Sequence, residues 1–350
     1  MSSVEEAQKI FQAIRDAELS GHPSCLLMIT TVKGSAYRRP GAKMMMAQDG
    51  RMVGTLSGGC LEGDLYHWAE EVMKTQRPEI RHYNLVEDEM WGLGIGCKGE
   101  IDVLIEPITR HRSFWLGFSE TLQSQSGILL ALELPDGERF YQEVSRERVS
   151  LGGKLSGDLS EQSFPMHGKT VHHDTAIWDY LVPPAKLIVA GAGQDAKPVV
   201  ELAHRVGFEV YVLDSRQLFN NPREFPGASK WMTDDKALGE SDDHHGAFWL
   251  IMNHHQARDE KALALALHSQ PRYVGVLGPL SRTRDMLTKL GVNSLTGIPL
   301  FAPVGLDLGA ETPEEVALSI VSQVMMMRQE TEGGHLTGRE MIHLTTEQEN

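Results

Sequence analysis

The fold of this chain is decided by the stretch Leu187-Ile188-Val189-Ala190-Gly191-Ala192-Gly193-Gln194-Asp195-Ala196. It joins a short apolar run to the pattern G-x-G-x-x-A, after which residues 195–205 show helical periodicity and residues 210–213 form a second apolar run. An apolar run, a glycine-rich turn, a helix and another apolar run are typical of a βαβ unit, whose two strands are parallel. The stretch therefore predicts a parallel sheet covered by helices.

The pattern continues on the C-terminal side of this unit. Two more short apolar runs with helical segments after them extend the predicted sheet, with strands at 248–252 and 273–277 and helices at 260–268 and 282–290. A last helix is expected over 313–328, because Thr312 is a good N-cap and Pro313 suits the first helical position. We predict a C-terminal Rossmann-like domain with a parallel sheet over residues 184–328, and a flexible tail at 329–350.

The glycine-rich turn has the residues of a nucleotide-binding loop. There Gly191 would allow the tight turn, Gly193 would let a pyrophosphate approach the helix N-terminus, and Ala196 would let the helix pack closely on the strand. Asp214 ends the second strand, where an acid usually binds a ribose hydroxyl, and Arg216 could pair with a phosphate. These residues predict a site for NAD(P) or another nucleotide. The alternative is a Rossmann scaffold whose crevice is empty or repurposed.

Residues 1–183 are expected to form a separate N-terminal α/β domain, with Pro183 and Pro184 at its boundary. Helical periodicity predicts helices at 4–19 and 61–74, and β-rich runs predict strands at 25–32, 44–47, 52–56, 82–85, 101–105, 128–134 and 140–144. Residues 145–175 are polar and weakly periodic, so we expect no regular element there. The fold class is therefore α/β throughout.

A loop between two of these strands concentrates positive charge. Gly34-Ser35-Ala36-Tyr37-Arg38-Arg39-Pro40-Gly41-Ala42-Lys43 holds three cations in an otherwise acidic chain. Two guanidinium groups and an ammonium group, held in a loop shaped by glycine and proline, could bind a phosphate or pyrophosphate. The alternative is a solvated turn whose arginines pair with surface carboxylates.

Two cysteines lie in glycine-rich segments. Gly58 and Gly59 precede Cys60 at the start of a predicted helix, and Cys97 lies in Gly92-Leu93-Gly94-Ile95-Gly96-Cys97-Lys98-Gly99. A helix N-terminus favours a thiolate, the form that acts as nucleophile or as ligand of a soft metal such as molybdenum or copper. Cys60 is thus a candidate metal ligand, and both thiols are candidate reactive groups. The alternative is that each is a small buried apolar residue.

The composition argues against several classes of protein. Of the 350 residues, 33 are Lys or Arg and 48 are Asp or Glu, and a net charge of −15 argues against a nucleic-acid or anionic-membrane binder. Three cysteines do not suggest a disulfide framework, and the chain shows neither a signal peptide nor an apolar run long enough to span a bilayer. We expect a cytoplasmic protein.

Taken together, these segments resemble the XdhC/CoxI family, the maturation proteins of xanthine dehydrogenase and related molybdenum hydroxylases. The resemblance rests on residues 34–43, 58–62 and 94–97, on Gly191 to Ala196 with Asp214-Ser215-Arg216, and on residues 303–315, in the family's order over residues 5–328. Two positions depart from the family's pattern, because Ser57 and Lys98 stand where glycine is often found.

The resemblance implies an accessory chaperone rather than an enzyme that turns over a substrate. Such a protein binds molybdenum cofactor, in the simple or the dinucleotide form, presents it to a cysteine desulfurase for replacement of an oxo ligand by sulfur, and inserts it into an apo-molybdoenzyme of the xanthine dehydrogenase type. The implied phosphate ligands are Arg38, Arg39 and Lys43, and the groups that approach the metal or the transferred sulfur are Cys60 and Cys97. An NAD(P)-dependent oxidoreductase is the alternative, and a homo-oligomer is left open.

Overall fold

The structure is a computed structural model that describes residues 3–85, 99–123, 126–134, 137–144, 170–173, 176–233, 244–292, 297 and 299–338. The chain divides into two compact units, one formed by residues 1–183 with 336–350 and the other by residues 184–335. We call them the N-terminal unit and the C-terminal unit and describe each by itself. Within the described ranges, no helix is both long enough and apolar enough to cross a membrane.

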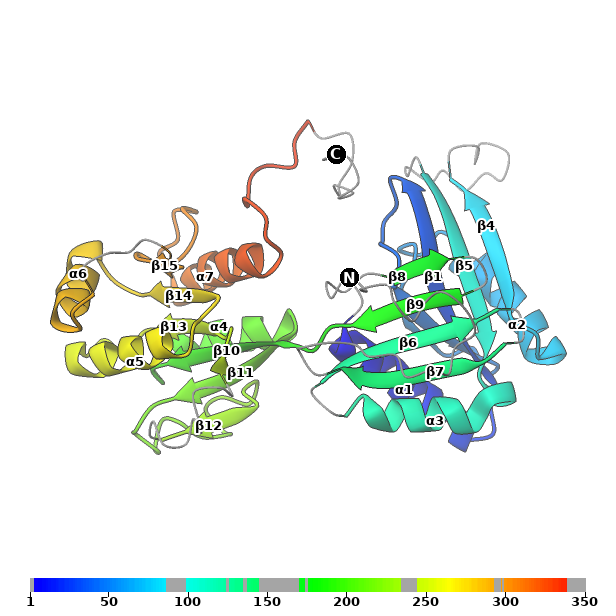
Figure 1. The fold of residues 1–350 in the computed structure, drawn as a ribbon, viewed down its shortest axis with the longest axis horizontal. Coiled ribbons are helices and arrows are strands. Elements are labelled where there is room, and N and C mark those ends of the chain that lie inside the picture. Colours follow the sequence, from blue (N-terminus) through cyan, green and yellow to red (C-terminus); the bar gives the residue numbers. More distant parts are fainter. Residues whose placement is uncertain are drawn as a thin grey trace. The chain divides into compact units, whose positions relative to one another are not determined.

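The C-terminal unit is built on a six-stranded parallel sheet (Figure 1). Its strands are β10 (Ala185–Ala190), β11 (Phe208–Leu213), β12 (Lys230–Met232), β13 (Phe248–Ile251), β14 (Tyr273–Val276) and β15 (Leu300–Phe301). Their spatial order is β12-β11-β10-β13-β14-β15, so the direction of winding reverses between β10 and β13. This is the strand order of a Rossmann fold, in which ligands bind at the carboxyl ends of the strands beside the reversal. The predicted Rossmann-like domain is confirmed.

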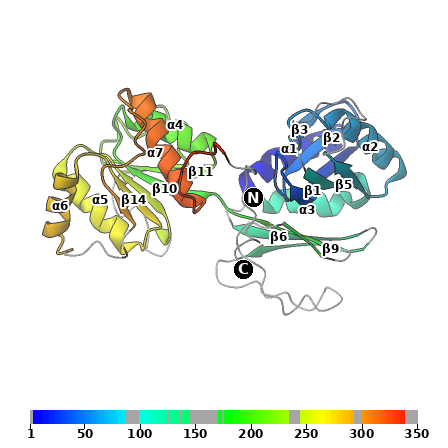
Figure 2. The same cartoon turned by 90° about the horizontal axis from the view of Figure 1, so that it is seen from above.

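Helices cover both faces of this sheet (Figure 2). The helices are α4 (Ala196–Arg205), α5 (Gln256–His268), α6 (Leu280–Lys289) and α7 (Pro313–Arg328). On β10, Leu187 and Val189 pack with α4 and α7, whereas Ile188 packs with α5 and α6 on the opposite face. Because both faces of the sheet are buried, β10 is apolar at successive positions instead of alternating with polar residues.

The N-terminal unit contains a five-stranded antiparallel sheet in the order β3-β2-β1-β5-β4. Its strands are β1 (Ser24–Gly34), β2 (Lys43–Ala47), β3 (Met52–Gly54), β4 (Glu79–Asn84) and β5 (Gly99–Pro107). The helices of the unit are α1 (Val4–Leu19), α2 (Glu62–Thr75) and α3 (Arg112–Thr121), the last preceded by a 3₁₀ turn at Thr109–His111. Successive β1 residues serve opposite faces: Leu27 packs in the cluster that contains α2, and Leu26 and Met28 pack with α1 and α3.

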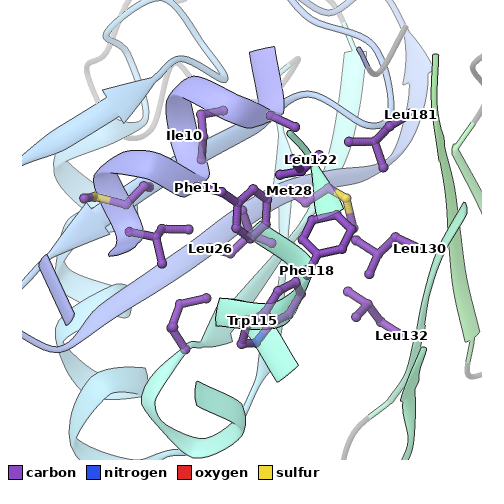
Figure 3. Close-up of a cluster of buried hydrophobic side chains, with 14 of the residues drawn as sticks. Ile10, Phe11, Leu26, Met28, Trp115, Phe118, Leu122, Leu130, Leu132 and Leu181 are labelled. Atoms are coloured by element: carbon purple, nitrogen blue, oxygen red, sulfur yellow. The ribbon is translucent and has the colours of Figure 1, made fainter. Parts of the chain in front are cut away.

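A second sheet closes the core of the N-terminal unit. It has the order β7-β6-β9-β8 and consists of β6 (Gly127–Glu133), β7 (Arg139–Val144), β8 (Thr170–His173) and β9 (Ala176–Leu181). Figure 3 shows Phe11 of α1 among Trp115 and Phe118 of α3, with Leu130 of β6 on the other side of these rings. Helices α1 and α3 thus lie in one apolar cluster between the two sheets, and this cluster fixes the sheets against each other.

The sequence patterns did not predict helix α3 or the strands β8, β9, β12 and β15, and β8 lies within residues 145–175, where we expected no regular element. Helix α3 and strand β9 show why. In α3, Gly117 and the aromatic residues weaken intrinsic helix propensity, and the helix is stabilised by burial of Trp115 and Phe118. In β9, Asp179 is fully buried and interrupts the apolar pattern at a position that faces the interior. Both elements depend on contacts with residues far away in the sequence.

Candidate functional site

Two loops of the N-terminal unit emerge at the same end of the five-stranded sheet. We call residues 34–43, which join β1 to β2, the arginine loop, and residues 54–62, which join β3 to α2, the cysteine loop. Because β1, β2 and β3 are antiparallel neighbours, the start of β2 lies beside the end of β3, as the pairing of Met44 with Gly54 shows. The sheet therefore brings the two candidate motifs of the sequence together.

The two loops meet at a small pocket. Its polar rim is formed by Tyr37 of the arginine loop and by Ser57 and Cys60 of the cysteine loop, and its apolar lining consists of Ile29, Ala36, Leu56, Leu61, Leu85 and Ile101. The ring of Tyr37 lies flat against Gly58, since three ring atoms would be 3.6–3.7 Å from a Cβ at that position. Cys60 is exposed. The pocket thus presents a thiol beside a partly exposed aromatic ring.

The shape of the cysteine loop is held by Glu62, to which the sequence analysis gave no role. Its carboxylate accepts hydrogen bonds from the backbone N–H groups of Ser57 (3.2 Å), Gly59 (3.0 Å) and Leu61 (3.2 Å) and from the hydroxyl of Ser57. Burial alone would raise the pKa of Glu62, but these hydrogen bonds outweigh burial and hold the pKa below its usual range. A carboxylate at the first position of a helix and three residues after a glycine pair is the signal that could have identified it.

The three cations of the arginine loop have different environments. Lys43 is 2% exposed, and its ammonium lies 2.5 Å from Asp179 of β9 and 2.9 Å from the carbonyl oxygen of Gly41. Arg38 is partly exposed and pairs with Glu6 of α1 at 2.5 Å. Arg39 is exposed and pairs with no carboxylate among the described residues. The phosphate role expected for Lys43 is therefore corrected to a structural role, because its charge is neutralised inside the unit.

Cys60 is the exposed thiol in the part of the chain that the structure describes. Cys25 of β1 is fully buried, and its thiol donates to the carbonyl oxygen of Ala69 at 3.6 Å. Burial, reinforced by the negative charges of Glu106 and Glu18, raises the pKa of Cys25 far above its usual range, so this thiol stays protonated. The other candidate thiol, Cys97, lies outside the described residues.

The glycine-rich loop of the C-terminal unit follows β10, at the reversal of the sheet. Gly191 has φ +131°, and a Cβ there would lie 2.5 Å from the carbonyl oxygen of Met252 at the end of β13, so no other residue fits. Ala196 is fully buried at the start of α4. At Gly193 a Cβ would overlap with Oδ1 of Asp195, whose other oxygen lies 2.7 Å from Nε2 of His254. A carboxylate thus lies over the glycine where we expected a pyrophosphate.

Asp214 differs from the expectation that it binds a ribose hydroxyl. Its fully buried carboxylate accepts hydrogen bonds from the N–H of Ala192 (2.9 Å) and from both the backbone and the guanidinium of Arg216. Burial alone would raise the pKa of Asp214, but these bonds outweigh burial and lower it. The carboxylate fixes the loop and orients Arg216, and it has no exposed surface to offer a ribose.

Comparison with known proteins matches a segment of each unit to a family model. Residues 187–324 match the family model described as the XdhC Rossmann domain, and residues 17–84 match the XdhC and CoxI family. The chain is 28% identical over 325 residues to a probable xanthine dehydrogenase subunit of Bacillus subtilis, covering 91% of this chain and 97% of that protein. It is 24% identical over 332 residues to the molybdenum cofactor insertion chaperone PaoD of Escherichia coli, covering 93% and 89% of the two chains.

A solved structure agrees with these matches. The crystal structure of a xanthine dehydrogenase from Bacillus halodurans is 31% identical to this chain, with a TM-score of 0.75, and the match covers 94% of this chain and 98% of that one. The likeness therefore extends over nearly the whole of both chains.

Proposed function

This chain belongs to the XdhC and CoxI family, and from that premise we propose that it binds molybdenum cofactor and inserts it into an apo-molybdoenzyme of the xanthine dehydrogenase type. The names of two relatives support the proposal, one a molybdenum cofactor insertion chaperone and the other a probable xanthine dehydrogenase subunit. The chain then acts as a carrier, and the cofactor is its cargo.

One observation carries the proposal: two loops on either side of the β2–β3 hairpin place the exposed thiol of Cys60 and the exposed ring of Tyr37 on one pocket. Molybdenum cofactor combines a soft metal held by a dithiolene, a pterin with a flat pyrimidine ring and a phosphate. A thiolate suits the soft metal and an aromatic ring suits the pterin. A guanidinium on the same loop as the ring suits the phosphate.

Each side chain of the site has a distinct part in this proposal. Cys60 approaches the metal, Tyr37 stacks on the pterin, and Arg39 binds the phosphate because its guanidinium is exposed and pairs with no carboxylate among the described residues. Glu62 holds the backbone of the cysteine loop, so Cys60 is presented in one conformation. Arg38 reaches the phosphate only by leaving Glu6, so it contributes less than Arg39.

The same site would also support sulfuration of the cargo. An exposed thiol beside an exposed aromatic ring lets a cysteine desulfurase approach the bound cofactor from solvent. We therefore include in the proposal that this chain presents the cofactor to such a desulfurase before insertion.

The experiment is to purify the full chain from a molybdenum-replete host and to quantify bound molybdenum and pterin. Cys60→Ala and Arg39→Ala should each lower both contents severalfold. Cys25→Ala, which removes a buried thiol, and Arg77→Ala, which removes an exposed guanidinium elsewhere in the same unit, are the matched controls and should retain the cofactor. Cofactor contents that are unaffected by Cys60→Ala and Arg39→Ala would refute the site, and a wild-type chain that never carries pterin would refute the carrier function.

A further inference from the structure

The carboxyl edge of the C-terminal sheet carries three arginines on different elements. Arg216 follows β11, Arg258 lies in the first turn of α5, and Arg282 lies in the first turn of α6. β13 leads into α5 and β14 leads into α6, so all three side chains start from the end of the sheet where Rossmann folds bind ligands. Of the three, only Arg216 belongs to a motif that predicts a phosphate ligand from the sequence.

Two buried carboxylates form ion pairs with these arginines. Asp214, whose side chain is fully buried, accepts from Arg216 at 2.6 Å and lies 4.0 Å from Arg258. Asp259, whose side chain is 1% exposed, pairs with Arg282 and accepts a hydrogen bond from the backbone N–H of Asn253 (3.0 Å). The two carboxylates thus tie the guanidinium groups to the ends of β11 and β13.

What this edge presents to solvent is positive charge. The side chains of Arg216, Arg258 and Arg282 are 38%, 39% and 25% exposed, whereas the carboxylates that neutralise them have almost no exposed surface. A guanidinium fixed by one carboxylate keeps its other N–H donors for a ligand and loses little conformational entropy on binding. This combination is suited to a small anion with several acceptor oxygens.

The neighbouring glycine-rich loop is not available to such an anion. The carboxylate of Asp195 lies against Gly193 and pairs with His254, so a phosphate there would meet a negative charge instead of free backbone N–H groups. The space around Gly278, next to Arg282, is open by contrast. Among the described residues, a Cβ placed on Gly278 would lie near a single atom, Nη1 of Arg282, at 3.5 Å.

We propose that the C-terminal unit binds a phosphoryl group through Arg216, Arg258 and Arg282, and not through its glycine-rich loop. Guanidinium groups bind phosphate oxygens in pairs and from several directions, which a tetrahedral dianion satisfies better than a planar carboxylate. The site is formed by residues of the C-terminal unit alone and does not depend on the function proposed for the cysteine loop.

The test is a calorimetric titration of the full-length chain with AMP, and with adenosine as the ligand that lacks the phosphoryl group. Arg258→Gln is the informative variant, because the Arg258 guanidinium lies 4.0 Å from Asp214 and its loss leaves the hydrogen bonds of that carboxylate intact. Arg284→Gln is the matched control, since Arg284 is an exposed residue of α6 and has no ion pair within the described ranges. Titration with ribose 5-phosphate tests whether the adenine base contributes to the affinity.

We expect AMP and ribose 5-phosphate to bind and adenosine not to bind. Arg258→Gln should weaken AMP by about tenfold, the usual effect of losing one charge-assisted hydrogen bond, while Arg284→Gln leaves the affinity unchanged. The proposal is overturned if adenosine binds as tightly as AMP, if AMP does not bind to the wild-type chain, or if the two variants behave alike. Molybdenum retention is unaffected by these outcomes, so failure here is distinguishable from failure of the carrier function.

Discussion

At the residue scale, Glu62 is the side chain on which the candidate site depends most directly. It accepts hydrogen bonds from three backbone N–H groups of the cysteine loop, and its pKa lies below the usual range. A carboxyl whose pKa is lower in the folded than in the unfolded state stabilises the fold above the unfolded pKa, about 4.3 for glutamate, and loses this contribution as the pH falls through the folded pKa.

We therefore predict that Glu62→Gln lowers the free energy of unfolding by about 1–3 kcal/mol at pH 7. The difference from wild type should begin to shrink as the pH falls below about 4 and should disappear below the lowered pKa of folded Glu62, where both chains carry a neutral group. Urea unfolding across this pH range measures the difference in the free energy of unfolding. The rate of alkylation of Cys60 measures whether the cysteine loop has become less ordered. Glu70→Gln on the same helix is the control, and a pH-independent difference would contradict the assigned cause.

The glycine-rich loop offers a second prediction, on two glycines of one motif. Gly191→Ala should cost about 3 kcal/mol or more, because φ is +131° and the new Cβ would lie 2.5 Å from the backbone oxygen of Met252. Gly193→Ala should cost less than about 1 kcal/mol, since it displaces the side chain of Asp195 and so loses only a partly exposed ion pair with His254. Thermal unfolding of both variants compares them. Equal losses of stability in the two variants would mean that Gly191 is not packed tightly against the backbone after β13.

Residue patterns predicted where these motifs lie but not what every residue in them does. Local spacing identified the glycines, Cys60 and the arginine loop because each belongs to a short motif next to a strand or helix. It could not show that Lys43 is neutralised by Asp179, because that partner is 136 positions further along the chain. It could not show that Asp214 is fully buried under Arg216 and Ala192, because burial depends on the folded unit.

At the element scale, buried ion pairs connect the two sheets of the N-terminal unit. Lys43 of β2 pairs with Asp179 of β9, and Arg139 of β7 pairs with Glu106 of β5, with exposures of 0–2% on all four side chains. Removing one partner of such a pair leaves a buried charge without compensation, which costs far more than the pair itself contributes.

Lys43→Met should therefore destabilise the protein by about 3–5 kcal/mol, and adding Asp179→Leu should restore much of that loss. The control is Lys33→Met, because Lys33 pairs with Glu100 at the surface and such pairs contribute at most about 1 kcal/mol. Chemical unfolding of the three variants gives the comparison. A Lys43→Met chain as stable as the control would show that the pair does not connect the sheets.

Elements with a complete local signal were predicted well, and those stabilised by distant contacts were not. The helix α7 begins at Pro313 as predicted, because Thr312 and Glu315 form a capping box that can be read from four residues. The strand β9 was missed because its pattern contains Asp179, whose burial is tolerated only beside Lys43. The helix α3 was missed because aromatic packing, rather than propensity, stabilises it.

At the scale of the whole molecule, the charge of the chain opposes the ligands that we propose for it. The net charge is −15, while a phosphoryl group and molybdenum cofactor are both anionic. At low ionic strength, about 10 mM, the Debye length of about 30 Å lets the whole protein repel an approaching anion. At about 0.15 M it falls to about 8 Å, so only nearby arginines act on the ligand.

The affinity for AMP should therefore increase severalfold between these two salt concentrations and decrease again at higher salt, when the arginine contacts themselves are screened. Titration of the full-length chain with AMP over a series of sodium chloride concentrations measures this dependence. In the Arg258→Gln variant, the affinity for AMP should still rise from low to physiological salt, because this rise comes from the net charge. The decrease in affinity at higher salt should be smaller than in wild type, because that decrease comes from the local arginine contacts. An affinity that only decreases from the lowest salt onward would mean that the local arginines outweigh the charge of the rest of the molecule at every distance.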